Sequence, residues 1–345
     1  MKTSINILLV FLFAACTSVP DERMTPYVDF PETRELTART LSLDSALFRY
    51  PYRVRVQDDK AVVLDLHGTE YFFHAFHYPG FHYLSSFGKR GDAPEEMLSA
   101  ENLRWNGNFL WTLDSNKSEL TRLGFASSGD SLLRLEAVSL DEELLRALDF
   151  VQYDDSTFII PDYSGDSRFC LVSRQGKLLH KIGTIPTTDE DALKNAHPAL
   201  AQAWRSFIDY NPRNGVLAAV TQLGEVLEIY NLKDSTHIVR IGPNGEPEFQ
   251  ISQGYGIPTG IMGFSDIQVT DSAIYVVFQG RAFKDIMQKA QQGINLPDGG
   301  QNIYVFSLEG KPLRKYVLDH YIHGISVDEQ KGIIIATDCL LYTSP

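Results

Sequence analysis

Ala61-Val-Val-Leu-Asp65 is a short hydrophobic run, and a polar turn and a second, alternating run follow it. The pattern recurs along nearly the whole chain, with first runs that begin at Ala61, Asn108, Thr157, Gly215, Ala273 and Gly332. The steps between them are 47, 49, 58, 58 and 59 residues. A period of about 40 to 50 residues with several strands per unit is typical of a β-propeller blade. The six units therefore predict an all-β, six-bladed β-propeller.

The repeat has no linker-like break, so residues 34–338 are interpreted as one domain. Three segments depart from the strand pattern and are predicted to be helical: 139–148, 189–207 with Pro198 as a break or second helix start, and 282–292 with Gly293 as a cap. The first two connect an outer strand to the next inner strand, and the third connects a second strand to a third. Both connections emerge on the same side of a four-stranded blade, so these insertions should share one face.

The sixth unit holds only two runs before the chain reaches Asp338. Propellers often complete the last blade with an N-terminal strand, which hides sheet edges, and residues 35–43 have the required alternation. Residues 339–345 (Cys-Leu-Leu-Tyr-Thr-Ser-Pro) resemble translated sequencing-adapter sequence, so we expect an artificial tail. The alternative is a short natural strand over residues 340–343.

The N-terminus has the pattern of an export signal. Lys2 precedes an apolar stretch, Ile5 to Phe13, which is too short to span a bilayer as a mature helix. Leu12-Phe13-Ala14-Ala15-Cys16 resembles a bacterial lipobox. We therefore expect residues 1–15 to be a lipoprotein signal peptide, Cys16 to carry the lipid and residues 16–33 to be a tether. An ordinary secretory signal is the alternative.

Charge limits the range of partners. The chain has 31 Lys and Arg against 44 Asp and Glu, for a formal net charge of −13. Nucleic acids attract basic surfaces, so a nucleic-acid partner is not expected. The expected location is the bacterial cell envelope, with membrane attachment through the N-terminal lipid. The side of the outer membrane, periplasmic or external, stays open.

One motif lies inside the repeat. Phe87-Gly-Lys-Arg-Gly-Asp-Ala-Pro-Glu-Glu96 closes the first unit, and Ile241-Gly-Pro-Asn-Gly-Glu-Pro-Glu248 closes the fourth. With the lipobox and the blade spacing, this resembles the TolB-like six-bladed propeller lipoproteins of Bacteroidetes-type bacteria. The resemblance implies a fold and a cell-envelope location, and it implies no shared activity. In physical terms, glycines at 88 and 91 allow positive φ where the chain turns back to the next inner strand.

No motif predicts a catalytic residue, because the chain has no G-x-S-x-G, H-E-x-x-H or Walker A sequence. The cluster His67, His74, His77 and His82 does not favour a metal site, since His74 and His77 should point to opposite faces of one strand. The loop 162–166 offers carboxylates suited to Ca²⁺, but an Asx turn is the favoured interpretation. No cofactor is therefore predicted, although Ca²⁺ stays open.

We hypothesise a binding or scaffold module for a peptide, a glycan or an envelope protein. Candidate contacts are polar residues on the loops of the face that should carry the helical insertions, namely His67, Arg90, Asp92, Asp114, Asp162, Tyr163 and Arg281. The alternative is a metal-dependent hydrolase or lactonase with an axial ion. The sequence shows no match to the axial ligand set of six-bladed lactonases, although Glu101, Asn102, Asp209, Asn211 and Asp266 lie near inner strands.

Overall fold

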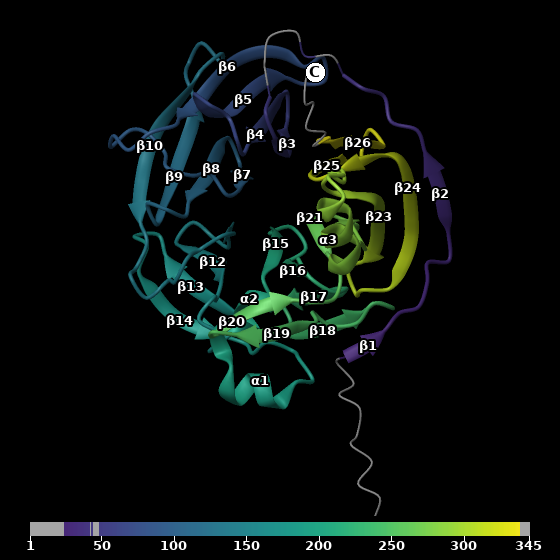
Figure 1. Cartoon of the computed structure of the whole chain (residues 1–345). Coiled ribbons are helices and arrows are strands. Elements are labelled where there is room, and N and C mark those ends of the chain that lie inside the picture. The colour runs from purple at the N-terminus through teal and green to yellow at the C-terminus, as the bar shows by residue number, and fades with distance from the viewer. Residues whose placement is uncertain (1–23, 42, 44–47, 339–345) are drawn as a thin grey trace, which may run out of the picture.

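The computed structural model describes residues 24–41, 43 and 48–338. The blade sheets stand around a central axis, with β3 (Pro51–Gln57), β7 (Leu103–Asn106), β15 (Ser206–Asn211), β21 (Phe264–Val269) and β25 (Ile325–Asp328) nearest that axis (Figure 1). The prediction of an all-β propeller is confirmed. The predicted signal peptide, Cys16 and the atypical tail lie outside the described residues.

Five blades are antiparallel sheets whose first four strands follow chain order. Blade one contains β3 (Pro51–Gln57), β4 (Lys60–Asp65), β5 (Tyr71–His77) and β6 (His82–Lys89). Blade two contains β7 (Leu103–Asn106), β8 (Phe109–Asp114), β9 (Glu119–Phe125) and β10 (Leu132–Ser139). Blade three contains β11 (Val151–Gln152), β12 (Thr157–Pro161), β13 (Phe169–Ser173) and β14 (Leu178–Ile182).

Blade four contains β15 (Ser206–Asn211), β16 (Val216–Thr221), β17 (Val226–Asn231) and β18 (Thr236–Ile241). Blade five contains β21 (Phe264–Val269), β22 (Ala273–Phe278), β23 (Gly300–Ser307) and β24 (Pro312–Ile322). The recurring hydrophobic run is the second strand of each blade. In blade four all six residues of β16 are buried, because neighbouring blades cover both faces of that strand.

The sixth position holds a two-stranded sheet of β25 (Ile325–Asp328) and β26 (Ile333–Ala336). β25 contacts β3 of blade one and β21 of blade five, so the pair lies between those two blades. The described residues therefore form five full blades and one two-stranded sheet.

The N-terminal segment corrects two predictions. Within the predicted tether 16–33, β1 (Met24–Pro26) pairs in parallel with β18, and Tyr27 and Phe30 are buried in the core shared by blades four and five. The predicted closing strand 35–43 is also wrong, because β2 (Thr33–Leu36) pairs in parallel with β24 of blade five. Residues 37–41 form no strand. The buried rings of Tyr27 and Phe30 hold residues 24–36, called the N-terminal strap below, against blades four and five.

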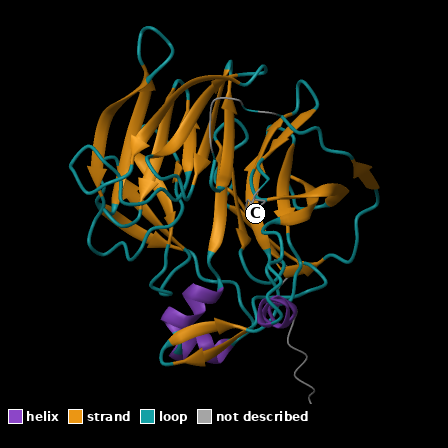
Figure 2. Ribbon diagram, turned by 45° about the horizontal axis from the view of Figure 1, so that its top comes forward, coloured by secondary structure: helices purple, strands orange, loops and turns teal. Residues whose placement is uncertain are grey.

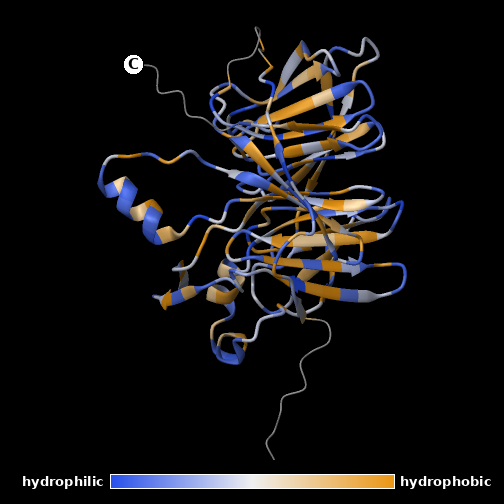
Figure 3. Cartoon of the chain, turned by 90° about the vertical axis from the view of Figure 1, so that its right-hand side faces the viewer, coloured by the Kyte–Doolittle hydropathy of each residue, from blue (hydrophilic) through white to orange (hydrophobic). Residues whose placement is uncertain are grey.

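Two of the three predicted helical segments are confirmed. Segment 189–207 contains α1 (Glu190–Asn195) and α2 (His197–Ala203), with a proline in the first turn of α2. Segment 282–292 contains α3 (Phe283–Gln291), and Gly293 follows with φ of 73°. A hairpin of β19 (Phe249–Ser252) and β20 (Tyr255–Pro258) was not predicted. Figures 2 and 3 show these helices and the hairpin on one side of the disk, called the helical face below.

Segment 139–148 is not a helix. Its backbone bonds to neighbouring elements instead, with the Leu140 N–H donating to Ser118 O and the Asp141 N–H to Gly176 O. Leu140, Leu144 and Ala147 are buried against blades two and three. The helix-like spacing of these three residues therefore belongs to an irregular connection and not to a helix. No helix in the described part of the chain is long and apolar enough to span a bilayer.

The Phe-Gly motif after blade one makes a turn, as predicted. Gly88 has φ of +66°, and a Cβ there would meet the Phe73 ring at 2.6 Å. Glu96 holds the turn closed, since its carboxylate accepts from Lys89 Nζ at 2.6 Å and from the Ala93 N–H at 3.3 Å. The motif therefore has a structural role in the first blade.

Candidate functional site

Three aspartates repeat one role near the axis. Each bonds to a backbone N–H of the next blade: Asp149 Oδ2 to Ile208 at 2.9 Å, Asp209 Oδ2 to Val269 at 2.7 Å and Asp266 Oδ2 to Ile325 at 2.8 Å. Their position at or just before an inner strand explains the repetition. These carboxylates link adjacent sheets around the axis.

Arginines neutralise the same aspartates. Arg104 forms ion pairs with Asp149 at 3.1 Å and with Asp209 at 3.0 Å. Asp266 forms ion pairs with both Arg53 and Arg55. Burial alone would raise the pKa of Asp266, but the two guanidinium groups lower it well below its usual range. For Asp209, burial outweighs the arginines and raises its pKa. The axial charges are therefore paired within the protein.

The five residues considered for an axial ion all bond to other groups of the protein; they are Glu101, Asn102, Asp209, Asn211 and Asp266. Asn102 donates to Asp149, Asn211 donates to Asp271, and Glu101 accepts from Ser115 Oγ at 2.6 Å. Within residues 24–41, 43 and 48–338, no three His, Cys, Asp or Glu side chains are placed to hold a metal ion. The oxygens that a cation would need thus have protein partners.

A second set of polar side chains lies at the end of the axis on the helical face. These residues stand just before or at the start of inner strands, or just after a second strand, so they lie at the end of the blades that carries the helices. We call the set the axial mouth; it comprises Tyr52, Glu101, Tyr163, Arg205 and His323. The charge of Glu101 acts on both Tyr52 and Tyr163, which belong to blades one and three. The five residues come from blades one to four and from the segment before β25, so they surround the axis.

Two polar atoms at the axial mouth have no hydrogen-bond partner in the described part of the chain. They are the Tyr163 hydroxyl and Arg205 Nε. Burial raises the pKa of Tyr163, Asp149 raises it further, and Arg205 and Arg168 oppose the shift. The phenol therefore stays protonated and available as a donor. An unpaired buried polar group costs about 1–3 kcal/mol, so both atoms are disposed to bond to a ligand.

His323 is neutral at the edge of the axial mouth. Its Nδ1 lies 2.8 Å from Arg53 Nη1, and because a guanidinium can only donate, Nδ1 must accept. Burial lowers the pKa of His323 to about 3, and the charge of Arg53 adds to the shift. Arg53 itself is 0% exposed and stacks between the rings of Tyr52 and Phe207, 4.1 and 4.5 Å from their centroids. Arg53 therefore packs behind Tyr52 of the axial mouth and is closed to solvent.

Beside the axial mouth, blades one and five share a polar flank. The Tyr50 hydroxyl donates to Asp298, and the Tyr50 ring lies 5.0 Å from the ring of His67. Arg281 donates to the carbonyls of Pro297 and Gly299, the residues on either side of Asp298. The connection that carries α3 is thereby fixed against the start of blade one.

The structure brings together three of the seven predicted contact residues. Tyr163 belongs to the axial mouth, while His67 and Arg281 belong to the flank. Three residues of the axial mouth, Tyr52, Arg205 and His323, were not predicted. Arg205 follows α2, which was predicted, but its importance comes from lacking an acidic partner among the described residues, and this has no sequence signal.

The other four predicted residues belong to neither the axial mouth nor the flank. Arg90 donates to the carbonyls of Leu66 and Gly68 and stacks on a phenylalanine ring, so it fixes a loop. Asp114 is buried and accepts from the Leu98 N–H at 2.7 Å. Asp92 is exposed on the loop after β6.

Asp162 makes the Asx turn that the sequence favoured over a Ca²⁺ loop. Its Oδ1 accepts from the Ser164 N–H at 3.0 Å, and its Oδ2 lies 3.2 Å from Lys181 Nζ. An ammonium group thus occupies the place next to the carboxylate that a cation would take. Cys170, on the next strand, is a buried free thiol whose pKa burial raises to about 12.

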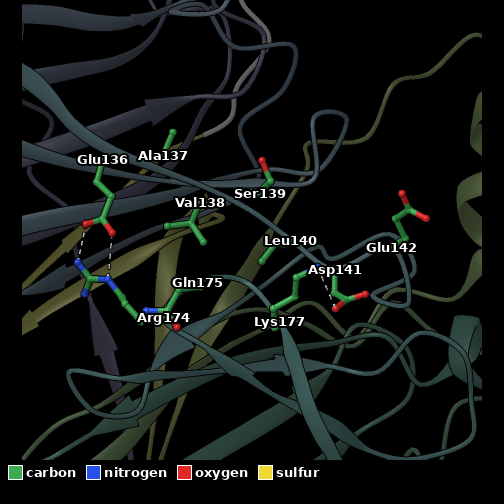
Figure 4. Close-up of a pocket in the computed structure, with 10 residues that line it drawn as sticks. All are labelled: Glu136, Ala137, Val138, Ser139, Leu140, Asp141, Glu142, Arg174, Gln175 and Lys177. Atoms are coloured by element: carbon green, nitrogen blue, oxygen red, sulfur yellow. Dashed lines mark hydrogen bonds and ion pairs between the residues drawn. The ribbon is translucent and has the colours of Figure 1, made fainter.

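A cavity of about 720 Å³ lies elsewhere, on the rim between blades two and three (Figure 4). Glu136 and Arg174 face each other across it, 3.2 Å apart at the Nε–Oε1 bond, and Lys177 lies 3.7 Å from Asp141. Figure 4 shows Glu142 pointing away from the other side chains. Four of the five charged side chains that line this cavity pair with each other, so it offers less to a ligand than the axial mouth.

The predicted separation of the histidines is observed in β5. His74 is buried and its Nδ1 lies 2.8 Å from Ser86 Oγ, whereas His77 is exposed beside Asp59. Burial lowers the pKa of His74. The two rings therefore do not share a site.

A family model matches this architecture. Residues 29–330 match the family described as TolB-like 6-blade propeller-like, and the chain belongs to that family. No curated protein matches the sequence.

Solved structures show the same fold at low sequence identity. A member of the DUF4221 family from Bacteroides vulgatus has 10% identity and a TM-score of 0.53, covering 88% of this chain and 91% of that one. An auxiliary nutrient binding protein from Bacteroides ovatus has 9% identity and a TM-score of 0.51, covering 85% of this chain and 67% of that one. These similarities establish the propeller fold alone.

Proposed function

We propose that this protein is a binding module of the bacterial cell envelope and that its ligand occupies the axial mouth. One observation carries the proposal. The deeper axial charges are paired, whereas the Tyr163 hydroxyl and Arg205 Nε at the axial mouth lack partners in the described residues. A bound peptide or glycan would satisfy these groups. Function in a rigid scaffold commonly resides on loops such as those that carry the helices here.

Binding is favoured over metal-dependent hydrolysis by the same contacts. An axial ion would have to displace Arg53 and Arg55 from Asp266, and Arg104 from Asp209. Removing one partner from a buried pair costs about 3–5 kcal/mol, which opposes that exchange. Retention of stoichiometric Ca²⁺ or Zn²⁺ by the purified protein after loading, measured by elemental analysis, would contradict this preference.

A thermal-shift screen of peptides and glycans tests the binding proposal. A ligand of the axial mouth should raise Tm of the unmodified protein and should raise it less in Tyr163→Phe and Arg205→Gln. Arg213→Gln is the matched control, because Arg213 is exposed and lies on a turn between a first and a second strand, away from the helical face. Equal shifts in all four proteins would place the ligand elsewhere.

Attachment to the membrane is a further part of the proposal and rests on the lipobox-like sequence ending at Cys16. Cells that make Cys16→Ala should release the protein from the membrane fraction, while the unmodified protein should stay there. Membrane retention of the variant would rule out lipid attachment at this residue.

We also propose that β25 and β26 are the inner half of a sixth blade. Ile325 repeats the link made at the other inner strands, because its N–H donates to Asp266 and its carbonyl accepts from Arg55 Nη1 at 2.8 Å. The family description, which names six blades, supports this count. An experimental structure that placed β25 outside the ring of inner strands would contradict it.

A further inference from the structure

We infer that the ligand carries a carboxylate, which accepts hydrogen bonds from Tyr163 and Arg205 at the axial mouth. This inference rests on the proposed binding function and adds the chemical class of the ligand. The charge and the placement of these two side chains carry it, in the following steps.

Arg205 is held firmly at the entrance of blade four. Its N–H donates to Gln202 O at the end of α2, and its carbonyl accepts from the Gln222 N–H at 2.8 Å. The preceding residue, Trp204, is 1% exposed in the core beneath α2. The backbone at Arg205 is therefore fixed by two elements, so its side chain starts from a defined position.

The charge of Arg205 is not neutralised by the residues that the structure describes. Arg53, Arg55, Arg104 and Arg168, which are buried near the axis, each have a carboxylate within 3.2 Å. Among the described residues, no acidic side chain lies within 4.0 Å of the Arg205 guanidinium, and its Nε is covered but has no hydrogen-bond partner. A half-buried guanidinium without a counterion favours an anionic ligand. Its planar donors match a carboxylate in particular.

Tyr163 supplies a second donor to the same group. It lies on the loop between β12 and β13, and Arg168 at the end of that loop donates to Trp204 O at 3.2 Å and Ser206 Oγ at 2.6 Å, on either side of Arg205. The Tyr163 hydroxyl is covered and has no hydrogen-bond partner among the described residues. A carboxylate has two oxygens with several lone pairs, so it can accept from a phenol and a guanidinium at once.

Glu101 opposes this ligand. Its charge also acts on Tyr163, and its carboxylate has a hydroxyl partner, Ser115, but no cation within 4.0 Å among the described residues. Removing that charge should therefore strengthen carboxylate binding, whereas a loss of structure would weaken it. Glu101→Gln thus gives a change in the opposite direction from Tyr163→Phe and Arg205→Gln.

Isothermal titration calorimetry with matched acid and neutral probes tests the inference. D-glucuronate against D-glucose represents acidic sugars, and N-acetyl-Ala-Ala against its C-terminal amide represents peptide ends. In at least one pair the acid should bind about tenfold tighter or more, because a charged hydrogen-bonded pair is lost in the neutral probe. Arg205→Gln and Tyr163→Phe should each weaken that acid about fivefold or more, Glu101→Gln should tighten it, and Arg213→Gln should leave it unchanged.

The outcomes separate the two proposals. If a neutral probe binds as tightly as its acid, and the binding still depends on Tyr163, the carboxylate inference fails while the binding site stands. If acid binding is the same in Arg205→Gln as in the unmodified protein, the inference also fails. If no probe binds and the wider peptide and glycan screen gives no shift, both proposals fail. Circular dichroism of each variant confirms that it is folded.

Discussion

Arg55 and Asp266 form a two-fold hydrogen-bonded ion pair, with Nη1 to Oδ2 and Nη2 to Oδ1 both 2.9 Å, that joins blade one to blade five. Ile325 of β25 bonds to both side chains, donating to Asp266 and accepting from Arg55. One ion pair therefore holds three sheets. It closes the ring at the point where the sixth position has only two strands.

Replacing Asp266 with Asn should be strongly destabilising. The change leaves Arg53 and Arg55 buried without a counterion, and loss of one partner of a buried pair costs about 3–5 kcal/mol. The free energy of unfolding from urea titration measures this. Glu190→Gln is the control, because Glu190 pairs with Lys194 on an exposed helix face, where such pairs contribute under about 1 kcal/mol. Similar values for both variants would contradict the assignment.

The same aspartate predicts a pH dependence. Its pKa in the folded protein is lowered, so its stabilising contribution is complete above the unfolded pKa of about 3.9 and declines as pH falls below it. The difference in unfolding free energy between the unmodified protein and Asp266→Asn should therefore be equal at pH 7 and pH 5. By pH 3 it should be smaller by about 1 kcal/mol. A difference that is constant down to pH 3 would show that the native pKa is not lowered.

Gly88 and Gly107 form a matched pair for testing the turn of the Phe-Gly motif. Both have positive φ, +66° and +54°, but a Cβ at 88 would meet the Phe73 ring at 2.6 Å whereas one at 107 has nothing within 4 Å. Gly107→Ala should cost about 1 kcal/mol from the backbone alone. Gly88→Ala should cost at least about 1 kcal/mol more, because the ring must shift within a packed core. Thermal and urea unfolding of the two variants would show whether the second cost exists.

The repeat predicted the blades well because its signal is local. Each recurring hydrophobic run is the second strand of a blade or of the two-stranded sheet, and in the five full blades these strands are mostly buried. The tight turn at Asn106-Gly107 and the start of α2 near Pro198 were also readable, since single residues set the backbone there. Blade order therefore follows from the sequence.

Long-range pairing and the axial mouth could not be predicted in the same way. β2 pairs in parallel with β24, about 280 residues away along the chain, and a strand carries no sequence mark of so distant a partner. Among the described residues, Arg205 differs from the other axial arginines by the absence of a nearby carboxylate, which depends on tertiary packing around the axis. Leu140, Leu144 and Ala147 had helical spacing but pack as turns, so tertiary contacts overrode the local pattern.

The N-terminal strap gives the last prediction. Phe30 is 8% exposed and packs against Tyr304 and Phe306 of blade five, with ring centroids 4.6 and 5.2 Å apart. Phe30→Ala should therefore lower the free energy of unfolding by about 3–5 kcal/mol, as for other buried phenylalanines. Val28, two residues earlier, is 84% exposed, so Val28→Ala should change it by less than about 0.5 kcal/mol.

Limited proteolysis of the same two variants reports where the lost stability acts. If the strap holds blades four and five together, Phe30→Ala should expose residues 24–36 to cleavage faster than Val28→Ala does, because the buried ring anchors both β1 and β2. Equal cleavage rates with an unchanged free energy of unfolding would mean that residues 24–36 follow the surface without stabilising it.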